Sequence, residues 1–285
     1  MKTLLQPIEL ANLMENTPVV VIDTRDPESY AAGHIPGAVN IREIFTYLAT
    51  TDTDGLDELE DKFAELFGKA GLSGEETAVL YEDAMNTGFG QSCRGYFLLK
   101  SLGYENAAVL HGGLAGWEAE GLPVTTDVPM PTPVTFPVSS SPTSLIATED
   151  EVLDAISDPD IVLLDVRDKD EWIGVSSSPY GVDFCPRKGR IPSAVWLEWY
   201  NLMYEDEDGI SMFQDPQTVA EACSKIGINA DSEVIIYCFK GARASNTFVA
   251  LQEAGIKNLK IYFGSWNEWS RNLDLPIDEN VLAAA

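Results

Sequence analysis

Residues 234–243 read Val-Ile-Ile-Tyr-Cys-Phe-Lys-Gly-Ala-Arg and join an apolar run to a short loop. The apolar run Val234–Tyr237 has the length and composition of a strand that is buried on both faces. Helical spacing follows over Ala244–Glu253 and ends before Gly255. Ligands of open parallel sheets bind beyond the carboxyl ends of strands, and Cys238 falls at such an end. We therefore expect a strand, a loop and a helix that place Cys238 at a binding site.

Cys238 has neighbours that favour a thiolate. Backbone N–H groups at the start of a helix carry positive partial charge, and Lys240 and Arg243 add two full charges within the same loop. Such surroundings can lower the pKa of a cysteine from about 8.5 to roughly 3.5–7.5. Gly241 tolerates the positive φ that a tight curl around sulfur needs. We therefore expect Cys238 to be ionised near neutral pH, open to solvent and nucleophilic.

The two halves of the chain repeat one pattern. An apolar run followed by Asp-x-Arg occurs at Asp23–Arg25 and again at Asp165–Arg167. Further matches follow in the same order in both halves, namely Gly33–Val39 with Gly189–Val195, Ala78–Tyr81 with Val234–Tyr237, Gly112–Trp117 with Gly264–Trp269, and Leu122–Pro123 with Leu275–Pro276. Short apolar strands alternate with helical segments, which predicts in each half an α/β domain whose parallel sheet has helices on both faces.

A stretch rich in Pro, Ser and Thr, 125–144, predicts a linker between domains at 1–124 and 145–285. Within these domains we expect helices over Leu56–Ala70, Gln91–Leu102 and Thr218–Lys225. Thr148 and Glu151 have the spacing of a capping box that opens the first helix of the second half.

The net charge of −28 disfavours nucleic acid and anionic membrane surfaces as partners. No apolar run approaches the roughly 18 residues that span a bilayer, and the N-terminal residues do not resemble a secretion signal. The four cysteines form no CxxC pair, so we expect reduced thiols and neither a disulfide framework nor a metal site. These features favour a soluble, cytoplasmic protein that needs no cofactor.

Several other polar residues are expected to be structural. Cys223 lies in an apolar helical stretch and is expected in the core, and Cys93, also in a helical stretch, is expected to be inert. His34 and His111 have no partners at metal-ligand spacing, and Asp165 and Arg167 are expected to pair at the strand exit. Cys185 lies in a polar segment, so we expect it to be exposed, with a redox or sulfur-relay role as a minor alternative.

The paired Asp-x-Arg strands, the Gly-His-Ile-Pro-Gly-Ala segment at 33–38 and the Tyr-Cys-x-x-Gly-x-Arg loop at 237–243 resemble the rhodanese family, in its tandem-domain thiosulfate sulfurtransferases. The resemblance implies that Cys238 is the catalytic cysteine. It also implies that the following loop cradles the anionic substrate, through Phe239, Lys240, Gly241, Ala242 and Arg243. In the first half Glu82 stands where the thiol would be, so we expect that half to be catalytically silent.

The expected chemistry is transfer of the outer sulfur of thiosulfate through a Cys238 persulfide to cyanide, a small thiol or a sulfur-accepting protein. A 3-mercaptopyruvate sulfurtransferase is an alternative, although members with that preference carry a Cys-Gly-Ser-Gly-Val-Thr loop. A non-enzymatic persulfide carrier is another. A related phosphatase fits less well, because those enzymes place five residues between Cys and Arg and here four separate Cys238 from Arg243.

Overall fold

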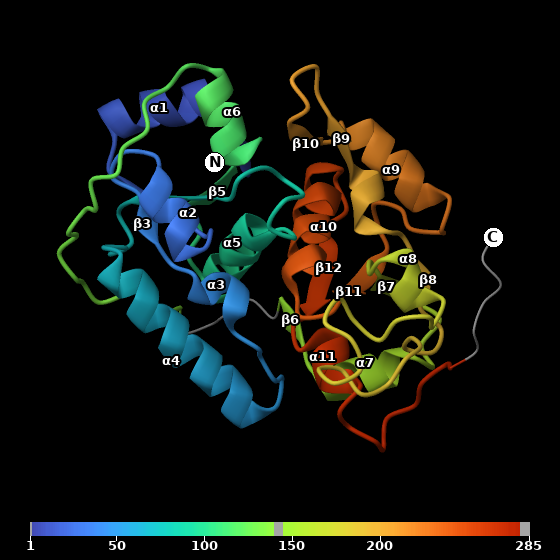
Figure 1. Ribbon diagram of the computed structural model, residues 1–285. Coiled ribbons are helices and arrows are strands. Elements are labelled where there is room, and N and C mark those ends of the chain that lie inside the picture. Colours follow the sequence, from blue (N-terminus) through green and yellow to red (C-terminus); the bar gives the residue numbers. More distant parts are fainter. Residues whose placement is uncertain (1, 140–144, 280–285) are drawn as a thin grey trace. The chain divides into compact units, whose positions relative to one another are not determined.

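The computed structural model describes residues 2–139 and 145–279 (Figure 1). Contacts divide the chain into two compact units, each of which contains a segment from the opposite half of the sequence. Unit 1 comprises residues 1–47, 57–143 and 203–213, and unit 2 comprises 48–56, 144–202 and 214–285. The domain boundaries expected from the sequence stay a prediction, and residues 140–144 of the expected linker lie outside the described residues.

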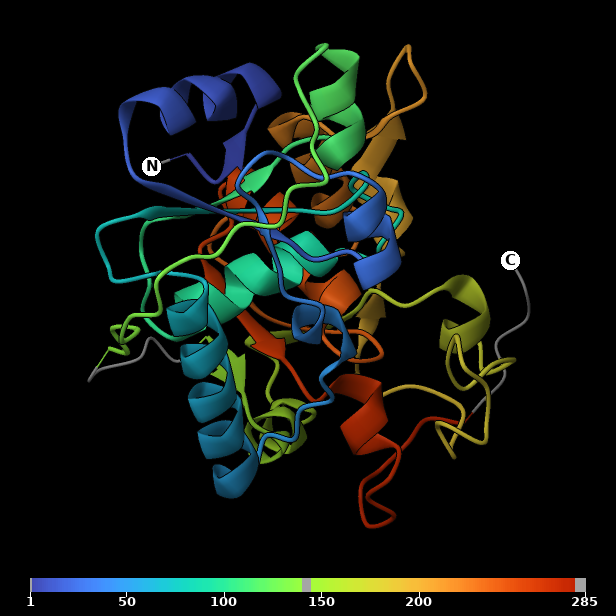
Figure 2. The same ribbon diagram turned by 60° about the vertical axis from the view of Figure 1, so that its left-hand side comes forward.

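Unit 1 contains a five-stranded parallel sheet in the order β1-β5-β4-β2-β3. The strands are β1 (Leu4–Leu5), β2 (Val19–Asp23), β3 (Val39–Asn40), β4 (Thr77–Tyr81) and β5 (Ala107–Leu110). The helices are α1 (Pro7–Asn16), α2 (Pro27–Ala32), α3 (Glu43–Thr46), α4 (Thr53–Lys69), α5 (Gln91–Ser101) and α6 (Gly113–Ala119), of which α4 is the longest and is seen in full in both ribbon views (Figures 1 and 2).

Unit 2 repeats this arrangement with a parallel sheet in the order β6-β12-β11-β7-β8. The strands are β6 (Ile146–Ala147), β7 (Ile161–Asp165), β8 (Val195–Trp196), β11 (Glu233–Tyr237) and β12 (Asn258–Tyr262). The helices are α7 (Glu149–Ala155), α8 (Lys169–Trp172), the 3-10 helix η1 (Trp199–Leu202), α9 (Pro216–Ser224), α10 (Ala242–Glu253) and α11 (Ser265–Trp269). The prediction of two α/β domains with parallel sheets is confirmed.

Alternate residues of the central strand of unit 2 serve its two faces, because side chains alternate along a strand. Ile235 and Tyr237 pack in one core cluster with Trp266 and Trp269 of α11. On the other face, α10 contacts both β11 and β12. A strand covered on both sides must be apolar throughout, which explains the continuous run before Cys238.

The expected helices are present as α4, α5, α9 and α10, with bounds that differ slightly from the expected ones. The helix expected from Thr218 begins at Pro216, because the Asp215 side chain accepts hydrogen bonds from the N–H groups of Gln217 and Thr218. The capping box is confirmed, with Thr148 N–H donating to Glu151 over 2.9 Å and the reciprocal bond at 3.2 Å.

A two-stranded antiparallel ribbon, β9 (Met203–Glu205) and β10 (Ser211–Phe213), belongs to unit 1 although the sequence places it in the second half (Figures 1 and 2). The Phe213 N–H donates to His111 Nε2 over 2.9 Å, and the Met85 N–H donates to the Ser211 carbonyl over 3.3 Å. This exchange of a segment was not expected from the repeat. No helix within residues 2–139 and 145–279 combines the length and apolarity needed to cross a membrane.

Candidate active site

Cys238 follows the last residue of β11, and the loop after it turns directly into α10. Gly241 adopts φ 90° as the residue before that helix, and its N–H points at Cys238 Sγ over 3.1 Å. A Cβ at Gly241 would lie 2.9 Å from the Phe263 ring, so the left-handed turn needs glycine for space as well as for φ. The predicted order of strand, loop and helix is confirmed.

The backbone of Cys238 is fixed by the start of α11. Its N–H donates to Ser265 Oγ over 3.2 Å, and its carbonyl accepts the Trp266 N–H over 3.1 Å. Ser265 itself has a φ of 53°, rare for a residue with a side chain, and donates its hydroxyl to the Tyr262 carbonyl over 2.7 Å. These bonds hold the sulfur-bearing residue in one position at the sheet edge.

The expectation that Cys238 is open to solvent is wrong, because the residue is 1% exposed. Its sulfur lies beneath its own loop, where the Gly241 N–H meets it. Phe239 is also buried, and its ring lies 5.3 Å from that of Tyr180 and 5.6 Å from that of Phe184. The rings of Tyr180 and Phe184 therefore pack on Phe239, the residue next to the thiol.

Lys240 and Arg243 are both buried, and they differ in their surroundings. The Lys240 ammonium lies 5.8 Å from the centre of the Tyr180 ring, in the range of a cation–π contact. The Arg243 guanidinium instead meets carboxylates, with Nη1 2.6 Å from Glu171 and 2.8 Å from Asp168. Burial alone would lower the pKa of Arg243, but the charge and hydrogen bonds of Glu171, together with the charges of Cys238 and Asp168, raise that pKa overall.

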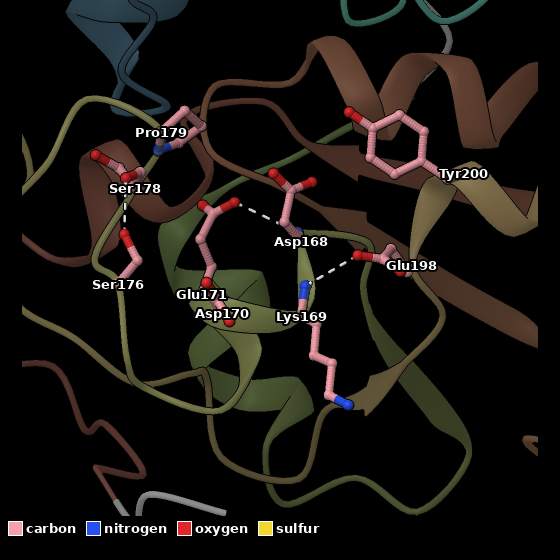
Figure 3. Close-up of a pocket in the computed structure, with 9 residues that line it drawn as sticks. All are labelled: Asp168, Lys169, Asp170, Glu171, Ser176, Ser178, Pro179, Glu198 and Tyr200. Carbon is pink, nitrogen blue, oxygen red and sulfur yellow. Dashed lines mark hydrogen bonds between the residues drawn. The ribbon is translucent and has the colours of Figure 1, made fainter. Parts of the chain in front are cut away.

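A pocket of about 460 Å³ lies at the turn that supplies these carboxylates (Figure 3). Its lining residues are Asp168, Lys169, Asp170, Glu171, Ser176, Ser178, Pro179, Glu198 and Tyr200. In Figure 3 the carboxylates of Asp168 and Glu171 lie near each other, and the Lys169 ammonium points away from them. Sequence reasoning missed this pocket, although the acidic run after Arg167 was a visible signal.

Part of the pocket wall comes from an insertion that the first half lacks. Arg25 and Gly33 are 8 positions apart, whereas the matching Arg167 and Gly189 are 22 apart, so the second half has fourteen extra residues here. The pocket residues Ser176, Ser178 and Pro179 lie within this longer connection, as do the aromatic neighbours of Phe239. The insertion thus contacts the candidate loop from outside.

The pairing of Asp165 with Arg167 is confirmed. Both side chains are fully buried, with Arg167 Nη2 2.6 Å from Asp165 Oδ2, and Nη2 also donates to the Gly189 carbonyl over 2.8 Å. The Tyr237 hydroxyl donates to Asp165 over 2.7 Å, and burial with the adjacent Asp165 charge raises the pKa of Tyr237, which keeps it a donor. This cluster joins β7 to β11 beneath the loop.

Cys223 is buried in its helix as predicted, and burial raises its pKa to about 11. Cys93 is buried as well, and burial raises its pKa, which agrees with the prediction of an inert thiol. The prediction of an exposed Cys185 is wrong, since that residue is 0% exposed and its sulfur lies 2.9 Å from Ser270 Oγ. Burial raises the pKa of Cys185, which disfavours a reactive thiolate. The polar neighbours of Cys185 in the sequence misled the expectation, because the thiol itself turns into the core around Trp266.

Both histidines have structural roles, as predicted. His34 is buried, stacks on Tyr30 at 3.9 Å and places Nδ1 2.9 Å from the Tyr30 carbonyl. His111 accepts the Phe213 N–H, and burial lowers its pKa to about 4, so it is neutral near pH 7.

Glu82 occupies in unit 1 the position that Cys238 has in unit 2. It follows β4, and its carbonyl accepts the Leu114 N–H over 2.8 Å, as the Cys238 carbonyl accepts that of Trp266. The carboxylate is fully buried and accepts bonds from the Gly88 N–H at 3.0 Å and the Ser92 hydroxyl at 2.6 Å. Burial raises the pKa of Glu82 to about 7. An acid side chain thus fills the place of the thiol.

The likeness of the two units extends to known proteins. The family model described as Rhodanese-like domain matches residues 6–120 and 148–272. The thiosulfate sulfurtransferases of Azotobacter vinelandii and Pseudomonas aeruginosa are each 28% identical over 276 residues, which is 96% of this chain and 96% of theirs. The solved wild-type structure of EanB has the same fold, with a TM-score of 0.82 at 23% identity over 98% of this chain and 70% of that one. Because the family matches both halves, the chain belongs to the rhodanese-like domain family.

Proposed function

We propose that the protein is a sulfurtransferase that takes the outer sulfur of thiosulfate onto Cys238. The observation that carries the proposal is the 3.1 Å contact between the Gly241 N–H and Cys238 Sγ at the carboxyl end of β11. Family membership supports it, as do the names of the relatives from Azotobacter and Pseudomonas. Glu82 in the matching place of the first half supports assigning the chemistry to the second half.

The reaction proceeds in two displacements at sulfur. The Cys238 thiolate attacks the outer sulfur of thiosulfate, the S–S bond of the donor breaks, and its electron pair leaves with sulfite. The persulfide then has its outer sulfur attacked by cyanide or a thiolate, and the electron pair of the broken bond restores the Cys238 thiolate. Negative charge is conserved in each step, so neither an oxidant nor a metal is required by the balance.

The loop Phe239–Arg243 supplies the positive field that stabilises the thiolate, the departing sulfite and the persulfide in turn. The Gly241 N–H at the start of α10 contacts Sγ, and backbone amides at such a turn favour an anion. Lys240 brings a full positive charge, which matters in a chain with a net charge of −28. Since Cys238 is 1% exposed, donor entry requires the covering side chains around Phe239 to move.

The test compares thiocyanate formation from thiosulfate and from 3-mercaptopyruvate in the wild-type protein, in Cys238→Ser and in Cys185→Ser. Wild type and Cys185→Ser are expected to use thiosulfate and to gain the mass of one sulfur atom, whereas Cys238→Ser does neither. Activity in Cys238→Ser would remove the nucleophile assigned here. Faster use of mercaptopyruvate would replace the proposed donor, and a stable persulfide without turnover of either donor would indicate a carrier.

A further inference from the structure

The buried ion pair between Glu171 and Arg243 belongs to the half that carries the cysteine. Gly90 and Gly241 are matching left-handed residues before α5 and α10, so Ser92 is the counterpart of Arg243. Asp26 and Asp168 are matching N-caps of α2 and α8.

This second match makes Ser29 the counterpart of Glu171. Both members of the ion pair are therefore serine in the first half, which has Glu82 in the place of Cys238. Because both positions differ between the halves, we infer that the Glu171–Arg243 pair is linked to the presence of Cys238 in the second half.

The serines of unit 1 have local partners. Ser29 donates its hydroxyl to Asp26 over 2.8 Å, within its own turn. Ser92 donates its hydroxyl to Glu82 over 2.6 Å, and so supports the residue at the thiol position directly. Ser92 thus hydrogen-bonds to Glu82, the residue that stands in the place of Cys238.

In unit 2 the matching Arg243 is directed to α8. Its two terminal nitrogens reach both oxygens of Glu171, at 2.6 and 3.1 Å, and Nη1 also reaches Asp168 at 2.8 Å. Glu171 is 2% exposed and Arg243 3%. A two-pronged, buried contact of this kind fixes geometry strongly, because both partners would be left uncompensated if it opened.

The contact with Glu171 also restrains the surroundings of the sulfur, because Arg243 is close in the chain to the residue that contacts it. Arg243 is the second residue of α10, and Gly241, whose N–H contacts Cys238 Sγ, is the residue immediately before that helix. The charge of Cys238 is also among the causes that raise the pKa of Arg243, after that of Glu171. Electrostatic coupling is reciprocal, so the balance of charge at Arg243 acts on the sulfur.

We propose that Glu171 is a positioning residue, which holds Arg243 and thereby the start of α10, where the Gly241 N–H contacts Cys238 Sγ. Two carboxylates, those of Asp168 and Glu171, balance the positive charge of Arg243. The negative charge of thiosulfate is therefore balanced by Lys240 and the loop amides. This inference rests on the proposed function, since it names how the same site is kept in shape.

The test is Glu171→Gln, with Asp170→Asn as a matched control from the same turn and pocket wall. Loss of a charge-assisted contact is expected to lower kcat for thiosulfate by roughly 10- to 100-fold, with the KM for thiosulfate changed less than about threefold. Asp170→Asn, whose carboxylate is exposed, is expected to keep both constants. A rise in KM alone would overturn the proposal, because Arg243 would then be a donor-binding group.

Alkylation of Cys238 by iodoacetamide gives a readout that does not depend on thiosulfate. In Glu171→Gln the charge of Arg243 has lost a balancing anion, so alkylation is expected to be faster, with its pH profile moved toward acid, while kcat falls. A pair that acted only on stability would leave the alkylation of folded protein unchanged, and that result would overturn the proposal. Failure of the wild type to use thiosulfate would refute the proposed function, and the alkylation comparison would still decide the role of Glu171.

A double variant, Glu171→Ser with Arg243→Ser, reproduces the pair of the first half. Removing both charges leaves only Asp168 without its cation, and the Asp168 side chain is 36% exposed, so this variant is expected to fold. Its kcat is expected to stay at least about tenfold below wild type, and Glu171→Asp is expected to recover part of the loss of Glu171→Gln. Wild-type turnover in the double variant would show that the pair does not position the loop.

Discussion

The two units have the same fold and differ at the carboxyl end of the central strand, β4 in unit 1 and β11 in unit 2. Both have the same strand order, and both bury an Asp–Arg pair that accepts a tyrosine hydroxyl, with Tyr81 donating to Asp23 over 2.6 Å and Tyr237 to Asp165 over 2.7 Å. After the tyrosine the units diverge, into Glu82 in one and Cys238 in the other. The shared cluster therefore supports the fold, and the reactive chemistry depends on the residue next to the tyrosine.

The divergence also changes the support of the shared arginine. In unit 1 Arg25 Nη1 contacts Asp83 at 3.0 Å, next to Glu82. In unit 2 the residue at that place is Phe239, and Arg167 Nη1 is buried without a hydrogen-bond partner among the described residues. The second half therefore has an aromatic ring beside the thiol where the first half has a carboxylate, and on the proposed function this difference spares an anionic donor one negative charge.

The most complete test of this contrast is Cys238→Glu, which gives the second half the residue of the first. Thiocyanate formation is expected to fall to the background rate, because a carboxylate cannot accept sulfur and repels thiosulfate. The measurement is the cyanide assay, with circular dichroism to confirm folding. The reverse variant, Glu82→Cys, is expected to create no activity, since the first half lacks Lys240 and Arg243; activity there would show that the framework alone suffices.

The shared arginine provides the next contrast. Asp165→Ala leaves Arg167 uncompensated and is expected to cost about 3–5 kcal/mol of unfolding free energy. Asp23→Ala is expected to cost about 1–2 kcal/mol less, because Arg25 retains Asp83. Urea denaturation of both variants measures the difference. Equal losses would mean that Asp83, whose side chain is half exposed, gives Arg25 no useful support.

Glu82 gives unit 1 a pH-dependent contribution to stability. An acid with its pKa raised to about 7 binds a proton more tightly when folded, so its contribution is fully present below the ordinary value near 4.5 and is lost as pH rises to about 7. The loss amounts to about 3 kcal/mol across that window. Thermal unfolding from pH 4.5 to 8 is expected to show a decline that Glu82→Gln flattens, and an unchanged slope would contradict the assignment.

Lys240→Ala is the smallest change. Loss of this charge is expected to weaken thiosulfate use by about 1–2 kcal/mol, mainly through KM, because the loop amides remain. Steady-state kinetics measure it, with Lys169→Ala as a control from the pocket wall whose ammonium points away from the acids in Figure 3. An effect on kcat alone would place Lys240 in the transfer step instead of in donor binding.

Much of the fold followed from local pattern. Apolar runs such as Val234–Tyr237 can only be buried strands, and Gly241 at the loop predicted the tight turn. The Asp165–Arg167 pair was predictable because its partners lie two positions apart. Contacts between distant segments were not, and Glu171 lies 72 positions from Arg243.

The burial of Cys185 was also not predictable from its neighbours in the sequence. Its neighbours in the sequence are polar, yet the thiol lies in the core, because residues that are far along the chain, such as Ser270 and Trp266, decide its burial. The accessibility of Cys238 was misjudged for a similar reason, since residues distant in the sequence, Ser265 and Trp266, bond to its backbone.

The ribbon Met203–Phe213 is encoded after the second Asp-x-Arg motif but is built into unit 1, and residues 48–56 are built into unit 2. A gene cut between the repeats would consequently give two polypeptides that each lack a piece of their own architecture. Such fragments are expected to be poorly stable apart and to reassemble when co-expressed, so any ancestral fusion of two copies has since become difficult to undo.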